Sequence, residues 1–219
     1  MTILARADRG DEASAIVDAN VAAGKTWAMT LKARFLSHEG EVEEAEALFR
    51  RAAAEGDSAG MLGIARLLIG DPTREEEGWQ WLERAADLGD PDAYLGMAIR
   101  CREAGDTTAA RSWYERAIDE HESAWAMREL GVIEREAGRI SEAMELFHRA
   151  AELGDTDAMY DIGIHYEHSG DRITAREWYQ RGADLGDEDC IRAVGVVDMA
   201  LGRDDSGVAE LRRAAEQGD

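Results

Sequence analysis

The fold is decided by the segment RAAELGD at residues 149–155, which returns along the chain almost unchanged. The other clear copies are RAAAEGD at 51–57, RAADLGD at 84–90, RGADLGD at 181–187 and RAAEQGD at 213–219, and degenerate copies end at Lys25 and Ser123. The seven segments end at positions 25, 57, 90, 123, 155, 187 and 219, which are 32, 33, 33, 32, 32 and 32 residues apart. A fixed period of this length is the signature of a repeat architecture, so we expect stacked copies of one small unit.

Each repeat is predicted to contain two amphipathic helices. After Asp155, the small residue Ala158 is followed by Met159 and then by Ile162-Gly163, so apolar and small residues recur at steps of three and four. Gly170 is expected to end this first helix, and the aspartate that closes each RAAxxGD segment is expected at a helix N-terminus. No stretch shows the period of two that a strand needs, so the chain is predicted to be all helical.

The second helix of each repeat carries the pattern A-x-x-W-Y-x-R or a variant of it. The pattern is clearest at residues 110–116 and 175–181. We assign its tryptophans Trp113 and Trp178, together with Trp81, to the core that the second helices share.

These patterns resemble tetratricopeptide repeats, and within that superfamily the Sel-like repeats. The residues that carry the resemblance are Met159, Ile162-Gly163 and Tyr166, followed by Ala175 and Tyr179, and the Gly-Asp that closes each unit. The resemblance implies an all-α fold of the α-α superhelix type, a right-handed solenoid of helix-turn-helix repeats. We expect one repeat domain over residues 1–219, with a half-repeat at about 11–24. The six full repeats are expected at 25–56, 57–89, 90–122, 123–154, 155–186 and 187–219.

The composition and charge of the chain limit the classes of partner that it is expected to bind. The chain has 219 residues, 45% of them hydrophobic, and its 47 acidic against 25 basic residues give a formal charge of −22. Nucleic acid and anionic membranes would repel such a chain, so neither is expected as its partner. The first residues contain no apolar stretch long enough for a signal peptide, and two cysteines suggest no disulfide framework, so we expect a cytoplasmic protein.

Three candidate sites for chemistry are each given a structural interpretation. Gly24-Lys25-Thr26 resembles the end of a phosphate-binding loop, but the first glycine of that motif would fall at Ala19 and no strand precedes it. His165 and His168 are three residues apart, as two metal ligands on a helix can be, but the repeat register supplies no third ligand. Cys101 and Cys190 are interpreted as small buried residues. We therefore expect no enzyme activity, no cofactor and no metal.

The resemblance implies that the first helices line a concave surface, to which residues two, five, nine, twelve and thirteen places after each segment point. Tryptophan and arginine stand out at these positions, and Tyr160 in the next unit and Arg102 in the previous one flank Trp125, Arg128 and Arg135. The candidate partner-binding residues are Trp27, Arg34, Arg66, Arg102, Trp125, Arg128, Arg135, Tyr160 and Arg192.

Aromatic and arginine side chains dominate the binding energy of many interfaces, and arginine suits carboxylates. The sequence therefore predicts a non-catalytic scaffold that binds an acidic and apolar protein segment. Trp125, Arg128 and Arg135 are expected to form its centre and to be replaceable without loss of stability.

Two alternatives remain at this point. The arginines could instead pair with acids on the same face, namely Asp92, Glu103, Glu136, Asp157, Glu167 and Asp189. The chain could also be a structural protein that assembles with its own copies through the array ends, or the repeat part of a larger regulatory protein.

Overall fold

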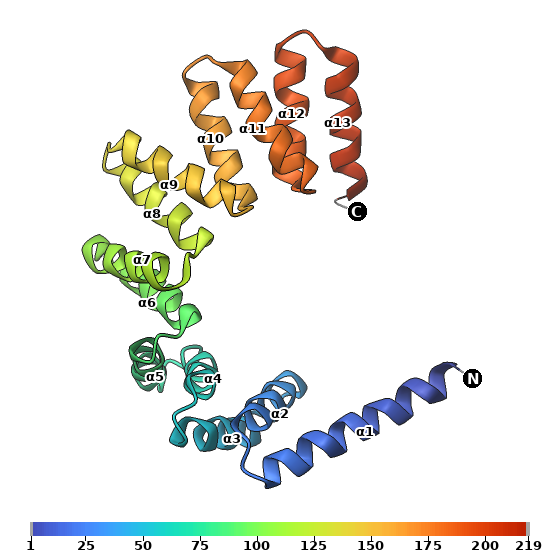
Figure 1. Cartoon of the computed structure of the whole chain (residues 1–219), viewed down its shortest axis with the longest axis vertical. Coiled ribbons are helices and arrows are strands. Elements are labelled where there is room, and N and C mark those ends of the chain that lie inside the picture. The colour runs from blue at the N-terminus through green and yellow to red at the C-terminus, as the bar shows by residue number, and fades with distance from the viewer. Residues whose placement is uncertain (1, 218–219) are drawn as a thin grey trace. The chain divides into compact units, whose positions relative to one another are not determined.

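The computed structural model describes residues 2–217, with side chains described for residue 10 and residues 12–216. This part of the chain forms thirteen α-helices and no strand, which confirms the predicted all-α class (Figure 1). The helices are α1 (Thr2–Ala22), α2 (Thr26–Glu39), α3 (Val42–Ala54), α4 (Ser58–Leu68), α5 (Glu75–Asp87), α6 (Pro91–Glu103), α7 (Thr107–His121), α8 (Ala124–Glu136), α9 (Ile140–Glu152), α10 (Thr156–His168), α11 (Arg172–Asp184), α12 (Glu188–Ala200) and α13 (Asp204–Gln217).

Neighbouring helices pack in pairs joined by short turns. The chain divides into two compact units, Met1–Ala104 and Gly105–Asp219. In the first unit α2 packs on α3 and α4 on α5, and α6 follows as its last helix. In the second unit α8 packs on α9, α10 on α11 and α12 on α13, with α7 against α8 (Figure 1). The first helix, α1, extends back to Thr2 and is therefore longer than the half-repeat expected at about 11–24.

Aspartates begin the first helices of the repeats, as their place in the repeated segment predicted. Asp57, Asp90, Asp155 and Asp187 each accept a hydrogen bond from the backbone N–H three residues later, at 2.9, 3.2, 2.7 and 2.8 Å. Ser123 takes the same role in the degenerate copy, at 3.3 Å. These caps satisfy an N–H group that the helix leaves unpaired. Gly218 and Asp219, which end the last segment, lie outside the described residues.

Small residues allow the helices of a pair to approach closely. Gly163 on α10 shows this best: a Cβ added there would lie 2.3 Å from Cε1 of Tyr179 on α11. The ring of Tyr179 is itself 1% exposed and packs with Ala175, Ile191 and Val194 in the core of the second unit. The predicted small positions are therefore contact points between helices.

The assignment of Trp113 and Trp178 to the core was wrong, whereas Trp81 is partly buried and packs against the core of the first unit. All three side chains are half-buried, and the residue after each of them, Leu82, Tyr114 or Tyr179, is buried instead. Consecutive residues of a helix point about 100° apart, so the residue after each tryptophan points more directly into the core than the tryptophan does. The outer faces of the tryptophans are covered by arginines three residues later: Arg84, Arg116 and Arg181 lie 4.6, 5.0 and 4.1 Å from the ring centroids.

Candidate partner-binding groove

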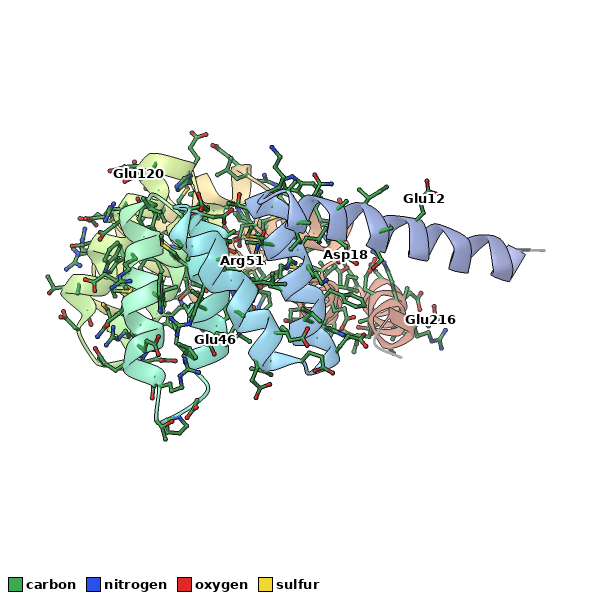
Figure 2. The ribbon with its side chains drawn as sticks, turned by 90° about the horizontal axis from the view of Figure 1, so that it is seen from below. Glu12, Asp18, Glu46, Arg51, Glu120 and Glu216 are labelled. Atoms are coloured by element: carbon green, nitrogen blue, oxygen red, sulfur yellow. The ribbon has the colours of Figure 1, made fainter. Side chains whose placement is uncertain are left out.

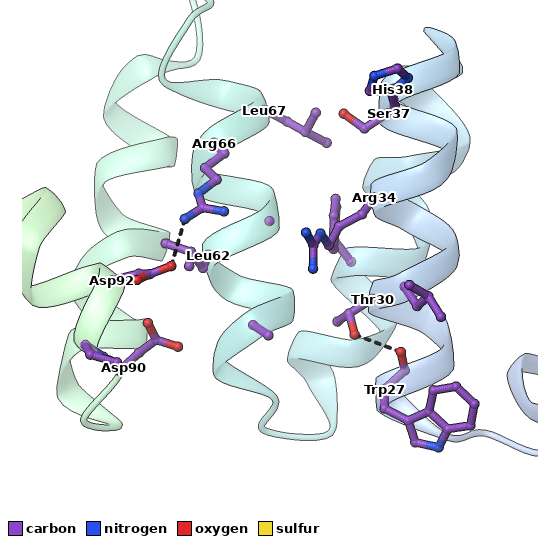
Figure 3. Close-up of a pocket in the computed structure, with 15 residues that line it drawn as sticks. Trp27, Thr30, Arg34, Ser37, His38, Leu62, Arg66, Leu67, Asp90 and Asp92 are labelled. Carbon is purple, nitrogen blue, oxygen red and sulfur yellow. Dashed lines mark hydrogen bonds and ion pairs between the residues drawn. The ribbon is translucent and has the colours of Figure 1, made fainter. Parts of the chain in front are cut away.

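The first helices of the first unit enclose an open groove, which we call the α2–α4 groove (Figure 3). Its cavity volume is about 930 Å³, and the start of α6 closes one side. The lining residues are Trp27, Thr30, Leu31, Arg34, Ser37, His38, Phe49, Ala59, Leu62, Gly63, Arg66, Leu67, Asp90, Pro91 and Asp92. Three of the nine residues predicted from the sequence, Trp27, Arg34 and Arg66, line the same groove.

The α2 wall presents large apolar side chains to solvent. Trp27 is 50% exposed, Leu31 is 47% exposed and Phe35 is 65% exposed. These residues are four apart, so they form one stripe along the helix, while Ala28, Met29 and Ala33 face the core. Trp27 and Leu31 line the groove, whereas Phe35 does not. Exposed apolar side chains gathered along one helix are a recognised mark of an interaction surface.

Arg34 is the cation of this wall. Its exposed side chain extends from α2 toward α4, and no described side chain forms a hydrogen bond or ion pair with its guanidinium (Figure 3). Thr30, one turn earlier, is 8% exposed and donates its hydroxyl to the backbone oxygens of Thr26 and Trp27, at 3.2 and 3.1 Å. Because no described side chain pairs with the guanidinium of Arg34, it is available to an anion in the groove.

Arg66 on the opposite wall is already paired. Its Nη2 lies 2.9 Å from Oδ2 of Asp92 on α6, and both side chains are mostly exposed (Figure 3). The neighbouring Asp90 accepts a 2.8 Å hydrogen bond from the hydroxyl of Ser58 besides capping α6. One of the alternatives raised by the sequence, pairing of the arginines with acids of the same face, thus applies to Arg66.

A second, smaller groove of about 400 Å³ adjoins the first between α4 and α6. It is lined by Leu62, Arg66, Ile69, Trp79, Leu82, Asp92, Leu95, Gly96 and Ile99. The Arg66–Asp92 pair belongs to both linings, so it stands between the α2–α4 groove and a more apolar one. Arg102, the remaining candidate of this unit, is exposed in the last turn of α6 and lines neither groove.

In the second unit, the two predicted arginines of α8 pair with a buried acid. Arg128 Nε lies 3.1 Å from Oδ2 of Asp161, and Arg135 Nη1 lies 2.7 Å from Oδ1 of the same carboxylate. Asp161 is on α10 and is buried, so the two arginines of α8 join neighbouring repeats. The expectation that Arg128 and Arg135 can be replaced without loss of stability is therefore corrected, because removal of either would leave a buried carboxylate with fewer partners.

The other candidates of the second unit also contact their own chain. Trp125 is half-buried, with its ring edge-on to Tyr114 at a centroid distance of 5.8 Å. Tyr160 packs against Tyr179 at 5.3 Å, and Arg192 pairs with Asp189 on its own helix. Of these side chains Arg192 is the most exposed. The predicted residues of the second unit are therefore more engaged with their own chain than those of the α2–α4 groove are.

Two buried carboxylates were not predicted from the sequence. Glu134 pairs with Arg111 and Arg139, and Asp198 pairs with Arg176 and Arg203. Both acids stand eleven places after their repeated segment, where other repeats carry Leu36, Leu68, Cys101 and Tyr166. The signal was an acid at an apolar repeat position, with an arginine five residues later.

Residues singled out for chemistry lie in ordinary structural settings. Cys190 is fully buried, as predicted, and burial raises the pKa of its thiol, whereas Cys101 is partly exposed. His165 is half-buried with its ring 5.5 Å from that of Tyr166. Across the described side chains, no three or more His, Cys, Asp or Glu residues are placed to hold a metal ion.

Acidic side chains such as Glu12 and Glu216 point away from the helices, in keeping with the high negative charge (Figure 2). None of the helices within the described range is long and apolar enough to cross a membrane.

Paired helices, aspartate caps and glycine contacts that return with a fixed period define an α-helical repeat solenoid. Models of the Sel1 repeat match residues 41–57, 61–90, 91–121 and 156–187, and a model of the tetratricopeptide repeat matches residues 123–154. The chain belongs to the Sel1 repeat family and contains one tetratricopeptide repeat. Proteins of these repeat families typically mediate protein–protein interactions and are typically non-catalytic.

Solved structures share the fold at low sequence identity. A Sel1 repeat protein from Oxalobacter formigenes has a TM-score of 0.73 at 20% identity, over 89% of each chain. The protective antigen c5321 of uropathogenic Escherichia coli gives 0.56 at 20% identity, over 93% of this chain and 56% of the antigen. The Cut9–Hcn1 hetero-tetramer of the APC/C gives 0.63 at 14% identity, over 93% of this chain and 42% of the matched one. No curated protein sequence matches significantly.

Proposed function

We propose that this chain is a non-catalytic interaction module that binds a segment of a partner protein on its first helices. The observation that carries the proposal is the open α2–α4 groove, in which exposed Trp27 and Leu31 lie on the same helix as the unpaired Arg34. Tryptophan and arginine side chains that lose their water on binding supply much of the binding energy at protein interfaces. The usual role of the two repeat families supports the same function.

The predicted residues take unequal parts in this proposal. Trp27, Arg34 and Arg66 belong to the main groove. Arg102 in the first unit and Trp125, Tyr160 and Arg192 in the second unit are proposed as further contacts with a partner. Arg128 and Arg135 contribute chiefly by holding Asp161 and thus the spacing of two repeats. A cytoplasmic location remains part of the proposal, and the two free cysteines, Cys101 and Cys190, support it.

A second candidate function is assembly of copies through the last repeat. The last helix, α13, exposes Val208 and Leu211 to 41% and 37%. If this surface joins copies, the wild type will sediment as oligomers and the Val208→Glu variant will sediment as a monomer. A strict monomer at high protein concentration excludes this function and leaves the groove as the interface.

Affinity purification from the source cell tests the main proposal. The wild type, Trp27→Ala/Arg34→Ala and the control Arg172→Ala are compared, with Arg172 chosen because it is exposed, lies in the other unit and is not among the predicted contacts. We expect a protein that the wild type and the control recover in equal amounts and that the double variant loses. Equal recovery by all three proteins would contradict binding in the groove.

A further inference from the structure

We propose that the α2–α4 groove selects a segment in which a single carboxylate lies close to a large apolar side chain, with Arg34 as the contact for the carboxylate. Asp92 acts as a specificity determinant, because it keeps Arg66 occupied and limits the groove to one strong anion contact. This inference rests on the proposed function and names the chemistry of the partner.

Charge complementarity points to an acidic partner at this place. The chain carries a formal charge of −22, yet both of its lysines, Lys25 and Lys32, lie on or just before α2, together with Arg34 and His38. The only acid of this helix is Glu39. Lys32 pairs with Asp18, whereas Lys25 and Arg34 have no described side-chain ion-pair partner. Neither lysine lines the groove, but together with Arg34 they make α2 a cationic helix on an acidic protein, and such a helix attracts anionic segments.

The spacing of the α2 side chains sets the spacing expected in the partner. Leu31 and Arg34 are three residues apart and Trp27 and Arg34 are seven apart, which at a rise of 1.5 Å per residue separates them by roughly 4.5 and 10.5 Å along the helix. An extended segment rises about 3.3 Å per residue. A carboxylate on Arg34 therefore places the apolar side chain that meets Leu31 or Trp27 about one to three residues away.

The Arg66–Asp92 pair acts on specificity more than on stability. Both side chains are exposed, at 63% and 59%, and such pairs contribute little to folding. Their main effect is that Arg66, on the wall opposite Arg34, already has an anion. A segment with two neighbouring acids gains only one free cation and meets Asp92 as a like charge. Removal of the Asp92 charge should therefore strengthen binding of acidic segments.

Selection from a phage-displayed library of random 12-residue peptides tests the inference with the full chain as bait. We expect enriched peptides to carry one Asp or Glu within about three residues of Trp, Phe or Leu. For a synthetic peptide of that sequence, Arg34→Ala should weaken binding at least ten-fold, Asp92→Asn should strengthen it several-fold, and the control Arg172→Ala, at an exposed arginine of α11, should change nothing. Changing the peptide's acid to the amide should cost the wild type ten-fold and cost the Arg34→Ala variant nothing further.

Enriched peptides without an acid, or an affinity that Arg34→Ala leaves unchanged, would overturn the inference, as would a library that yields no peptide competing at the groove. Peptides that bind through Trp125 or Tyr160 would overturn it while leaving the interaction function intact. Unchanged thermal melting of Arg34→Ala confirms that the variant is folded, as expected for an exposed side chain with no described partner.

Discussion

Arg135 on α8 donates a 2.7 Å hydrogen bond to Asp161 on α10, so a residue that the sequence assigned to a partner instead joins two repeats. Arg128 reaches the other oxygen of the same carboxylate, which is 7% exposed as a side chain. The clamp shows how a repeat array with a strongly acidic composition places some of its acids inside, where arginines neutralise them.

Arg135→Ala is expected to lower the free energy of unfolding by about 1–2 kcal/mol, because a buried carboxylate loses one of its charged donors. A urea-unfolding curve, followed by a signal from the second unit, measures the change in the free energy of unfolding. Arg192→Ala, whose arginine pairs only with acids of its own exposed helix face, serves as the control and should stay within about 0.5 kcal/mol of the wild type. Identical midpoints for Arg135→Ala and wild type would show that the clamp carries no stability.

Acid should weaken the protein through its arginine-held carboxylates. Hydrogen bonds from Arg176 lower the pKa of Asp198 to about 2, and hydrogen bonds from Arg74 lower the pKa of Glu46 to about 2. A carboxyl whose pKa is lower in the folded than in the unfolded state stabilises the fold above its unfolded pKa. That contribution is lost as the pH falls from about 4 toward 2.

Asp198→Asn separates this effect from general acid unfolding. The variant should be less stable than wild type at pH 7 by about 2 kcal/mol, because the amide replaces a charged acceptor of Arg176, Arg203 and Ser206. The difference should shrink as the pH falls toward 2. Melting curves at several pH values check this, and a constant difference across the range would contradict the assigned pKa.

Gly163→Ala should destabilise the second unit by about 1–3 kcal/mol, since the added methyl group would lie 2.3 Å from the ring of buried Tyr179. Gly10→Ala is the matched control, because no atom lies within 4 Å of a Cβ there and alanine favours a helix. Thermal denaturation compares the two variants. A Gly163→Ala protein as stable as Gly10→Ala would mean that the two helices do not need the close approach.

Most of the fold could be predicted from the repeat period. Regular anchors such as Asp57 and Asp155 mark helix starts by local capping chemistry, so sequence alone could locate them. The resemblance to tetratricopeptide repeats pointed to Trp27, Arg34 and Arg66, which line the α2–α4 groove, and their part in partner binding stays a prediction.

The remaining site residues needed three-dimensional information. Whether an arginine meets solvent or an acid depends on the neighbouring repeat: Arg34 has no described acidic partner, while Arg66 meets Asp92 and Arg135 meets Asp161. Likewise, the sequence could not decide which residue of a Trp-Tyr pair faces the core. These outcomes depend on contacts between residues about 22 to 33 positions apart, which a local pattern does not encode.

The most direct test of the central claim, that a partner binds in the α2–α4 groove, is site-specific photo-crosslinking in the source cell. The photoreactive residue replaces Leu31, which lines the groove at 47% exposure, or Ile173, which is 62% exposed on α11 and lines no groove described above. We expect a discrete cross-linked protein from position 31, lost when Arg34→Ala is added, and none from position 173. A partner that cross-links at position 173 and not at position 31 would contradict it.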